Sequence, residues 1–272
     1  MPGQPDHTLG DGTVGKALLV LDQVAAFGRP VRFSELQQDS RFPKATLYRL
    51  LQTLTSQGML RHDPGQGTYT LGVRLVRLAH AAWQTTSLAP VARPHIDALS
   101  AKLGETVHLA QLDHAQVLYV DKRNADVPVE MYSQAGKVGP AYCTGLGKAM
   151  LAFLPEAELA PILAQQSFHR FTPNTLCDAA ALRAELALIR DRGYAFDNEE
   201  HEPGILCIAM PVRLPGGHVL GALSVTAITA RRTLTELAAL APALAASAAH
   251  IAQDASHWRF PDRRTPLFSR TG

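Results

Sequence analysis

The sequence lacks the long apolar runs that membrane proteins need. A membrane-spanning helix takes about 18 uninterrupted apolar residues, and no stretch of this 272-residue chain approaches that length. The first dozen residues are polar and carry no apolar segment typical of a secretion signal, so they predict a frayed leader. We therefore expect a cytoplasmic protein without a membrane partner.

The chain has few cysteines and a small net charge. The three cysteines, Cys143, Cys177 and Cys207, are far apart and form no CxxC pair, which indicates reduced thiols rather than a disulfide framework. The net charge is only +2, so the whole-chain balance points to no class of partner. Residues 1–83 carry nine basic and six acidic side chains, and this mildly basic segment is compatible with contacts to DNA phosphates.

Signatures of hydrolases and zinc proteases are absent, since the chain has neither a GxSxG nor an HExxH motif. We predict no catalytic residue, no metal and no cofactor. Two alternatives stay open: a nucleophile pair formed by Cys207 and His201, and a metal bound by the charged run 199–202. Neighbouring residues on a strand face opposite ways, so that run converges poorly on one ion.

The N-terminal part has the pattern of successive short helices. Apolar residues recur at spacings of three and four from Val14 to Ala25, which predicts an amphipathic helix that ends at Gly28. A capping-box pattern, with Ser34 as the cap and Gln37 reaching back, predicts a short second helix. Pro43 suits the first position of a third helix, where its missing N–H costs nothing.

The third helix is the most informative element. Its leucines repeat at i, i+3, i+4 and i+7 and must face a core: Leu47, Leu50, Leu51 and Leu54. The other face is polar and suits a DNA major groove, where Arg pairs with guanine and Gln with adenine. The candidate DNA-contacting residues are Lys44, Ala45, Thr46, Tyr48, Arg49, Gln52 and Thr53. The alternative is a helical subdomain whose polar face meets only water.

A hairpin follows these helices. Residues 59–62 and 67–71 alternate around the turn 63–66, which predicts two paired strands. Three helices and a hairpin within about 60 residues are typical of a winged helix-turn-helix, here assigned to residues 13–72. The apolar stripe of residues 73–83 predicts a linker helix within residues 73–87, although the same stripe suits packing on its own domain.

Residues 88–255 show a mixed α/β pattern, and residues 256–272 are expected to be a flexible tail. Helices are predicted at 91–103, 145–154, 156–165, 179–192 and 234–252. Strands are predicted at 105–112, 116–122, 129–133, 194–199, 205–212 and 219–227. The last two strands form a hairpin because the turn 215–218 joins them, so the sheet is expected to be rich in antiparallel pairs.

Five segments in this order resemble the IclR family of bacterial transcription regulators. They are residues 42–51 (FPKATLYRLL), 69–72 (YTLG), 144–149 (TGLGKA), 193–200 (GYAFDNEE) and 203–212 (PGILCIAMPV). The resemblance covers roughly residues 14–252. It implies an α+β multidomain chain with a winged helix-turn-helix, a linker helix and a GAF-like α/β effector domain. It further implies homodimers or homotetramers on palindromic double-stranded DNA operators, controlled by a small-molecule effector, often a carboxylate.

Spacing also predicts where such an effector binds. Ile205 and Cys207 share one strand face, and Ser224 and Thr226 share a face of the partner strand, so the two pairs suit one cavity. The helix that starts near Gly145 offers free N–H groups to an anion. Such a cavity suits a small molecule with a carboxylate or carbonyl group.

The resemblance places effector contacts at Gly145, Leu146, Asp197, Ile205, Cys207, Ser224 and Thr226. It implies that Leu146 and Thr226 set the choice of ligand. Each position has a simpler explanation: a small buried thiol, hydroxyls bonded to the backbone, an exposed strand-end carboxylate, or glycines that allow close packing. A phosphate loop is excluded, because the position five before Gly147 is Tyr142. A stand-alone sensory module that binds another protein is a third function, which the third helix argues against.

Overall fold

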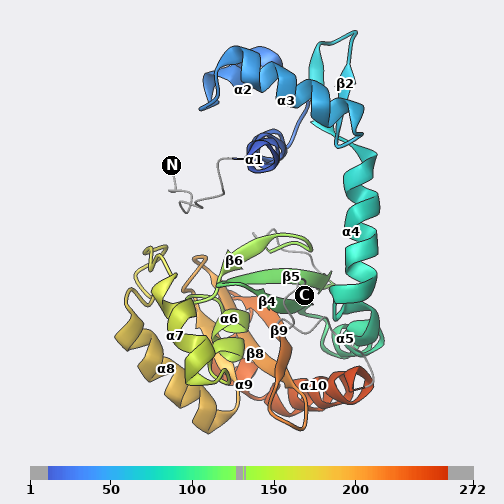
Figure 1. Ribbon diagram of the computed structural model, residues 1–272. Helices are drawn as coiled ribbons and strands as arrows, with labels where there is room; N and C mark the ends of the chain where they lie inside the picture. The colour runs from blue at the N-terminus through green and yellow to red at the C-terminus, as the bar shows by residue number, and fades with distance from the viewer. Residues whose placement is uncertain (1–11, 127–130, 132, 257–272) are drawn as a thin grey trace, which may run out of the picture. The chain divides into compact units, whose positions relative to one another are not determined.

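The computed structural model describes residues 12–126, 131 and 133–256, and it divides between Thr85 and Thr86 into two units (Figure 1). Each unit has its own sheet and its own hydrophobic core. Helix α4 (Val73–Thr86) crosses the division. No helix among the described residues is both long and apolar enough to cross a membrane.

The first unit is a winged helix-turn-helix. Its elements are α1 (Thr13–Ala26), β1 (Val31–Arg32), α2 (Phe33–Gln38), α3 (Lys44–Ser56), β2 (Leu60–Asp63) and β3 (Thr68–Leu71). The four leucines of the α3 stripe are all buried, which confirms the predicted inner face of that helix. Strands β2 and β3 form the predicted hairpin, and β1 adds to its other side in the order β1-β3-β2.

The second helix starts two residues earlier than the sequence predicts. Its N-cap is Arg32, whose backbone N–H donates to Glu35 Oε2 at 2.8 Å. The predicted cap at Ser34 with Gln37 is therefore wrong. The reason is that β1 pairs with β3 and already holds the preceding backbone extended. Pro43 is likewise the N-cap of α3 rather than its first helical residue.

The chain leaves the hairpin through a glycine that no larger residue can replace. The Gly72 N–H donates to the Met59 carbonyl at 2.8 Å. A Cβ at position 72 would lie 2.1 Å from the carbonyl oxygen of Gly58, far inside contact distance. This close approach fixes the point at which α4 begins.

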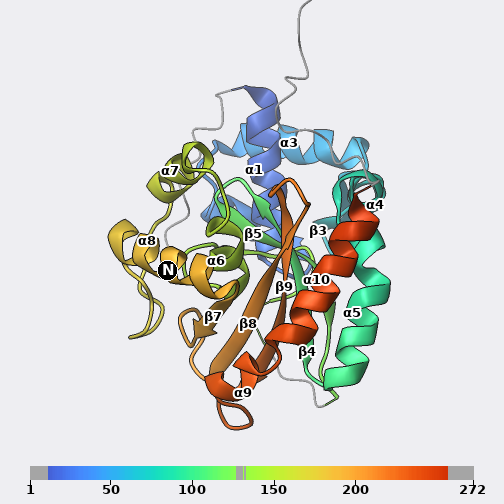
Figure 2. The ribbon, with the colours of Figure 1, turned by 90° about the horizontal axis from the view of Figure 1, so that it is seen from below.

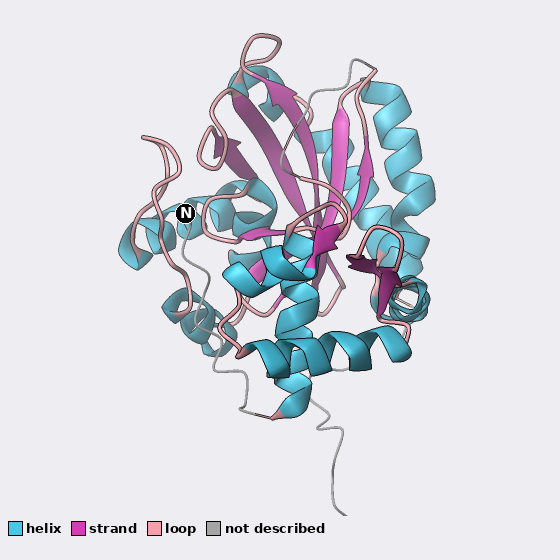
Figure 3. Cartoon of the chain, turned by 90° about the horizontal axis from the view of Figure 1, so that it is seen from above, coloured by secondary structure: helices cyan, strands magenta, loops and turns pink. Residues whose placement is uncertain are grey.

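The second unit is a six-stranded sheet with helices beside it. Its elements are α5 (Ala89–Leu103), β4 (Thr106–Asp113), β5 (Gln116–Arg123), β6 (Val138–Pro140), α6 (Gly145–Leu151), α7 (Glu156–Ala164), α8 (Ala179–Arg192), β7 (Ala195–Asn198), β8 (Ile205–Arg213), β9 (Val219–Ile228), α9 (Leu234–Ala238) and α10 (Ala241–Ala255). The strands lie in the order β6-β5-β4-β9-β8-β7, and every neighbouring pair is antiparallel. Figure 3 shows them as one curved sheet. The predicted antiparallel-rich sheet is confirmed.

Helices cover both faces of this sheet. Figure 2 shows α5 and α10 on one side and α6 and α8 on the other. Helix α6 packs against β7, β8 and β9, whereas α10 packs against β8, β9 and α5. The core between α6 and the sheet is rich in small residues, so α6 approaches the strands closely. This arrangement places the start of α6 beside the ends of β7 and β8.

Two predicted elements differ in this unit. The single helix expected at 234–252 is two helices, because Pro242 lies in the first turn of α10 and the chain bends just before it. The strand expected at 129–133 falls mostly outside the described residues, and Met131 and Ser133 are not in a strand. The third strand described in this unit is instead β6, which the sequence pattern missed. The predicted tail 256–272 lies outside the described residues, except for Ser256.

Candidate functional site

The outer face of α3 carries the candidate DNA-contacting residues. Six of these side chains are exposed and Thr46 is half-buried; the exposed ones are Lys44, Ala45, Tyr48, Arg49, Gln52 and Thr53. The buried leucine stripe on the opposite side makes this orientation obligatory. The helix therefore presents a guanidinium, an amide and an ammonium group to solvent.

Two of these side chains have contacts within the unit. The Thr53 hydroxyl donates to the Arg49 carbonyl at 2.9 Å, so it is engaged with its own helix. The Tyr48 ring meets Phe33 of α2 edge-to-face, with centroids 6.0 Å apart. Arg49 and Gln52 are thus the exposed side chains best suited to reach base edges in a major groove.

Hydrogen bonds hold the turn of the hairpin that follows α3. Asp63 Oδ1 accepts from the Gly65 N–H at 2.9 Å and from the Gln66 N–H at 3.2 Å. The rings of His62 and Tyr69 lie 4.6 Å apart between the two strands. These contacts hold β2 and β3 as a firm wing beside α3.

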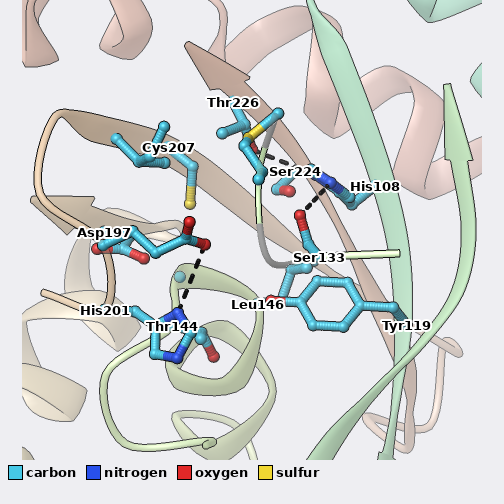
Figure 4. A pocket seen from close by; sticks show the side chains of 14 residues that line it. His108, Tyr119, Ser133, Thr144, Leu146, Asp197, His201, Cys207, Ser224 and Thr226 are labelled. Atoms are coloured by element: carbon cyan, nitrogen blue, oxygen red, sulfur yellow. Dashed lines mark hydrogen bonds and ion pairs between the residues drawn. The ribbon is translucent and has the colours of Figure 1, made fainter. Parts of the chain in front are cut away.

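A pocket of about 400 Å³, including the space at its open mouth, lies in the second unit (Figure 4). It is lined by His108, Tyr119, Met131, Ser133, Thr144, Gly145, Leu146, Asp197, His201, Glu202, Ile205, Cys207, Ser224 and Thr226. All seven residues expected to contact an effector are among them. The fold brings them together from α6, β7, β8 and β9, which are widely separated along the chain.

The start of α6 forms the floor of the pocket. Thr144 Oγ1 caps the helix by accepting from the Gly147 N–H at 3.3 Å. The N–H groups of Gly145 and Leu146 belong to the first turn, where a helix has no carbonyl partners for them. A Cβ at Gly145 would lie 2.5 Å from Cys207 Sγ, so this glycine does allow close packing.

His108 is the main lining residue that sequence reasoning missed. Its Nε2 lies 2.8 Å from Ser133 Oγ and its Nδ1 lies 3.3 Å from Thr226 Oγ1. Burial, and secondarily the charge of Lys122, lowers the pKa of His108 to about 3, so the imidazole is neutral. Its position between Val107 and Leu109 in the strand was the available signal, but only the β4–β9 pairing shows which cavity it faces.

Asp197 is the buried carboxyl group of the pocket. Its Oδ1 accepts from the Glu200 N–H at 2.8 Å. Burial, and after it the neighbouring Glu200 carboxylate, raises the pKa of Asp197 to about 7. Lys148 forms a buried ion pair with Glu200 beneath the pocket. The alternative of an exposed strand-end charge at Asp197 is therefore wrong.

The enzyme alternatives find no support at this site. Burial raises the pKa of the Cys207 thiol well above its usual range, so the reactive thiolate is disfavoured. His201 lies beside Glu202, with 3.7 Å between Nδ1 and Oε1. Among the described residues, no three His, Cys, Asp or Glu side chains converge in a metal-binding arrangement.

Comparison with known proteins agrees with this architecture. The protein-family model named "Bacterial transcriptional regulator IclR C-terminal" matches residues 80–253. The family model of the IclR helix-turn-helix domain matches residues 13–64. The chain belongs to the IclR family. IclR-family proteins are transcription regulators rather than enzymes, with an N-terminal DNA-binding domain and a C-terminal ligand-binding domain.

Individual relatives cover most of the chain. The transcriptional regulator XynR of Escherichia coli K12 is 34% identical over 83% of this chain and 90% of its own length. The regulator KdgR of Dickeya chrysanthemi is 35% identical over 84% of this chain and 73% of its own. The crystal structure of Thermotoga maritima IclR matches 89% of this chain and 97% of its own, with 29% identity and a TM-score of 0.72.

Proposed function

We propose that the chain is a transcription regulator whose binding to operator DNA is controlled by a small organic acid held in the pocket of the second unit. In this proposal, residues 13–72 bind DNA, residues 73–87 link the domains, and residues 88–255 bind the effector. The DNA contacts come from the exposed face of α3, and the effector contacts come from the seven residues gathered in the pocket.

The observation that carries the effector assignment is the Ser224 hydroxyl. Ser224 lines the pocket, is only 1% exposed, and its Oγ has no hydrogen-bond partner among the described residues. A buried hydroxyl without a partner is costly, so it points to a ligand that supplies one. Gly145 and Leu146, in the first turn of α6, line the same pocket, and free N–H groups at the start of a helix favour a carboxylate oxygen.

Control of DNA binding requires that the acid binds one arrangement of the two units better than another. Helix α4 runs from the wing into the second unit, so it is our candidate for the element that changes. We also propose a homodimer or homotetramer, because two recognition helices match the two half-sites of a palindromic operator.

The test is selection of sheared genomic DNA by the purified chain, repeated with a panel of small organic acids. The expected result is one discrete palindromic site whose recovery one acid abolishes or induces. Recovery of no specific DNA under any condition would contradict the DNA-binding half of the proposal. Recovery of a site that no acid affects would contradict the effector half.

A further inference from the structure

The pocket lacks the positive side chains that usually hold a carboxylate. Among the described residues, no Lys or Arg lines the pocket, whereas two acidic residues, Asp197 and Glu202, do line it. An anionic effector would thus meet two carboxylates in a buried cavity, where repulsion between like charges is strong. Something must neutralise at least one of them when the effector binds.

Asp197 is the carboxyl group placed to be neutral. It is 7% exposed, whereas the Glu202 side chain is 31% exposed and lies beside His201. One Asp197 oxygen accepts a backbone N–H. Protonated on its other oxygen, this group would donate a hydrogen bond to a ligand carboxylate, as charge-assisted pairs do. The groups that act electrostatically on Asp197 come from β5, the segment before α6, α6, the segment after β7, and β8. They are Tyr119, Cys143, Lys148, Glu200, His201 and Cys207.

The buried ion pair of Lys148 and Glu200 lies close to Asp197 and affects whether the Asp197 carboxyl group is protonated. Lys148 and Glu200 are 1% and 6% exposed, and their side chains form an ion pair that ties α6 to the segment after β7. The Lys148 ammonium is thus engaged by Glu200 rather than by the pocket. Glu200 Oε2 has no hydrogen-bond partner among the described residues, which leaves a negative oxygen buried close to Asp197. The Glu200 backbone N–H also fixes the position of the Asp197 carboxyl.

We propose that the pocket binds a carboxylate together with one proton taken from solvent, that Asp197 holds this proton, and that the buried Lys148–Glu200 pair positions Asp197 to do so. This inference rests on the proposed function, because it assumes a carboxylate effector. The pKa of Asp197, near 7, means that the proton is taken up on binding mainly above neutral pH.

The experiment uses acetate as the probe, because it carries the carboxylate alone and stays ionised between about pH 6 and pH 9. Equilibrium dialysis of the full chain with radiolabelled acetate gives the Kd for acetate at each pH between about 6 and 9. The expected Kd is nearly constant below neutral pH and rises about tenfold per pH unit above it. Acetamide, a neutral molecule of the same shape, is the ligand control and should bind with a pH-independent Kd.

Matched variants assign the proton. Asp197→Asn keeps a donor without a titrating group, so its Kd for acetate should not vary with pH. His201→Gln removes a second titratable side chain of the pocket and should keep the rise in Kd, moved if at all to higher pH because His201 lowers the pKa of Asp197. A flat profile in His201→Gln, or a wild-type profile in Asp197→Asn, would overturn the assignment to Asp197.

The double variant Lys148→Met/Glu200→Gln tests the positioning pair without leaving a buried charge unpaired. Glu200 raises the pKa of Asp197 more strongly than Lys148 lowers it, so removing both charges should lower the pKa of Asp197. The rise in the Kd for acetate should therefore begin at a lower pH than in the wild type. An unchanged starting pH in a folded double variant would overturn the role of the pair.

The outcomes separate this inference from the function beneath it. Acetate binding with a pH-independent Kd in the wild type would overturn the proton uptake and leave a carboxylate effector intact. Absence of acetate binding at every pH, in a folded protein, would overturn the proton-coupled carboxylate site, whereas an effect of another acid of the panel on operator recovery would keep the proposed function.

Discussion

His108 of β4 lies directly opposite Ser224 of β9, yet the two side chains do not bond to each other. The imidazole is instead engaged with Ser133 at 2.8 Å and Thr226 at 3.3 Å. Two hydroxyls of the pocket are therefore satisfied within the protein, and the Ser224 hydroxyl is not. This difference divides the polar lining into a structural part and a part available to a ligand.

Ser224→Ala should weaken effector binding without weakening the fold. Loss of one hydrogen bond predicts an effector affinity lower by about 1–2 kcal/mol, measured by titration. The free energy of unfolding in denaturant should stay within about 1 kcal/mol or rise, because an unpaired buried hydroxyl is removed. Thr226→Val is the matched control, and it should lower stability because it leaves His108 Nδ1 without its partner. Full effector affinity in Ser224→Ala would place the contact elsewhere.

His108 should make the protein sensitive to acid. Its pKa falls from 6.5 in the unfolded chain to about 3 in the fold, so the unfolded state binds the extra proton between these values. Stability is therefore fully present above about pH 6.5 and is lost as pH falls towards 3, by at most about 1.4 kcal/mol per pH unit. His108→Gln should flatten this part of the profile of unfolding free energy against pH. Equal acid sensitivity in the two proteins would contradict the buried neutral imidazole.

Local pattern predicted much of the candidate site. Alternation along two strands placed Cys207 with Ile205 and Ser224 with Thr226, and the observed β8–β9 register pairs Cys207 with Thr226. Side chains alternate between the two faces of a strand, and a short turn joins neighbouring strands of a hairpin. Both features are local, so the sequence is enough to predict which of these residues share a face. The resemblance to a family supplied Asp197, which no spacing argument reached.

What could not be predicted depends on contacts between distant segments. His108 joins the pocket only because β4 pairs with β9, more than 100 residues away, and no local signal encodes that register. Lys148 and Glu200 lie 52 residues apart, and their ion pair follows from the docking of α6 on the sheet. The wrong cap at Ser34 has the same origin, since the pairing of β1 with β3 moved the helix start.

Gly145→Ala should close the floor of the pocket. The added Cβ would lie 2.5 Å from Cys207 Sγ, and relief by movement should lower the free energy of unfolding by about 1–3 kcal/mol. Removal of the sulfur in Gly145→Ala/Cys207→Ala leaves contacts of 3.3 Å to the Asp197 nitrogen and 3.4 Å to Ala209 Cβ, so the double variant should recover part of this loss. A double-mutant cycle measures the coupling, and additive effects would show that the two atoms do not compete for space.

Arg49→Ala should weaken operator binding by about 1–3 kcal/mol if the exposed guanidinium of α3 contacts a base edge. Lys102→Ala removes the same charge from an exposed position on α5 and is the matched control for net charge.

Fluorescence anisotropy with operator and scrambled DNA at several salt concentrations distinguishes a contact to a base from a contact to a phosphate. A base contact predicts a loss confined to the operator. A phosphate contact predicts an equal loss on both DNAs and a shallower salt dependence, because one fewer counterion is released. Unchanged affinity on both, with the fold intact, would remove Arg49 from the interface and direct attention to Gln52.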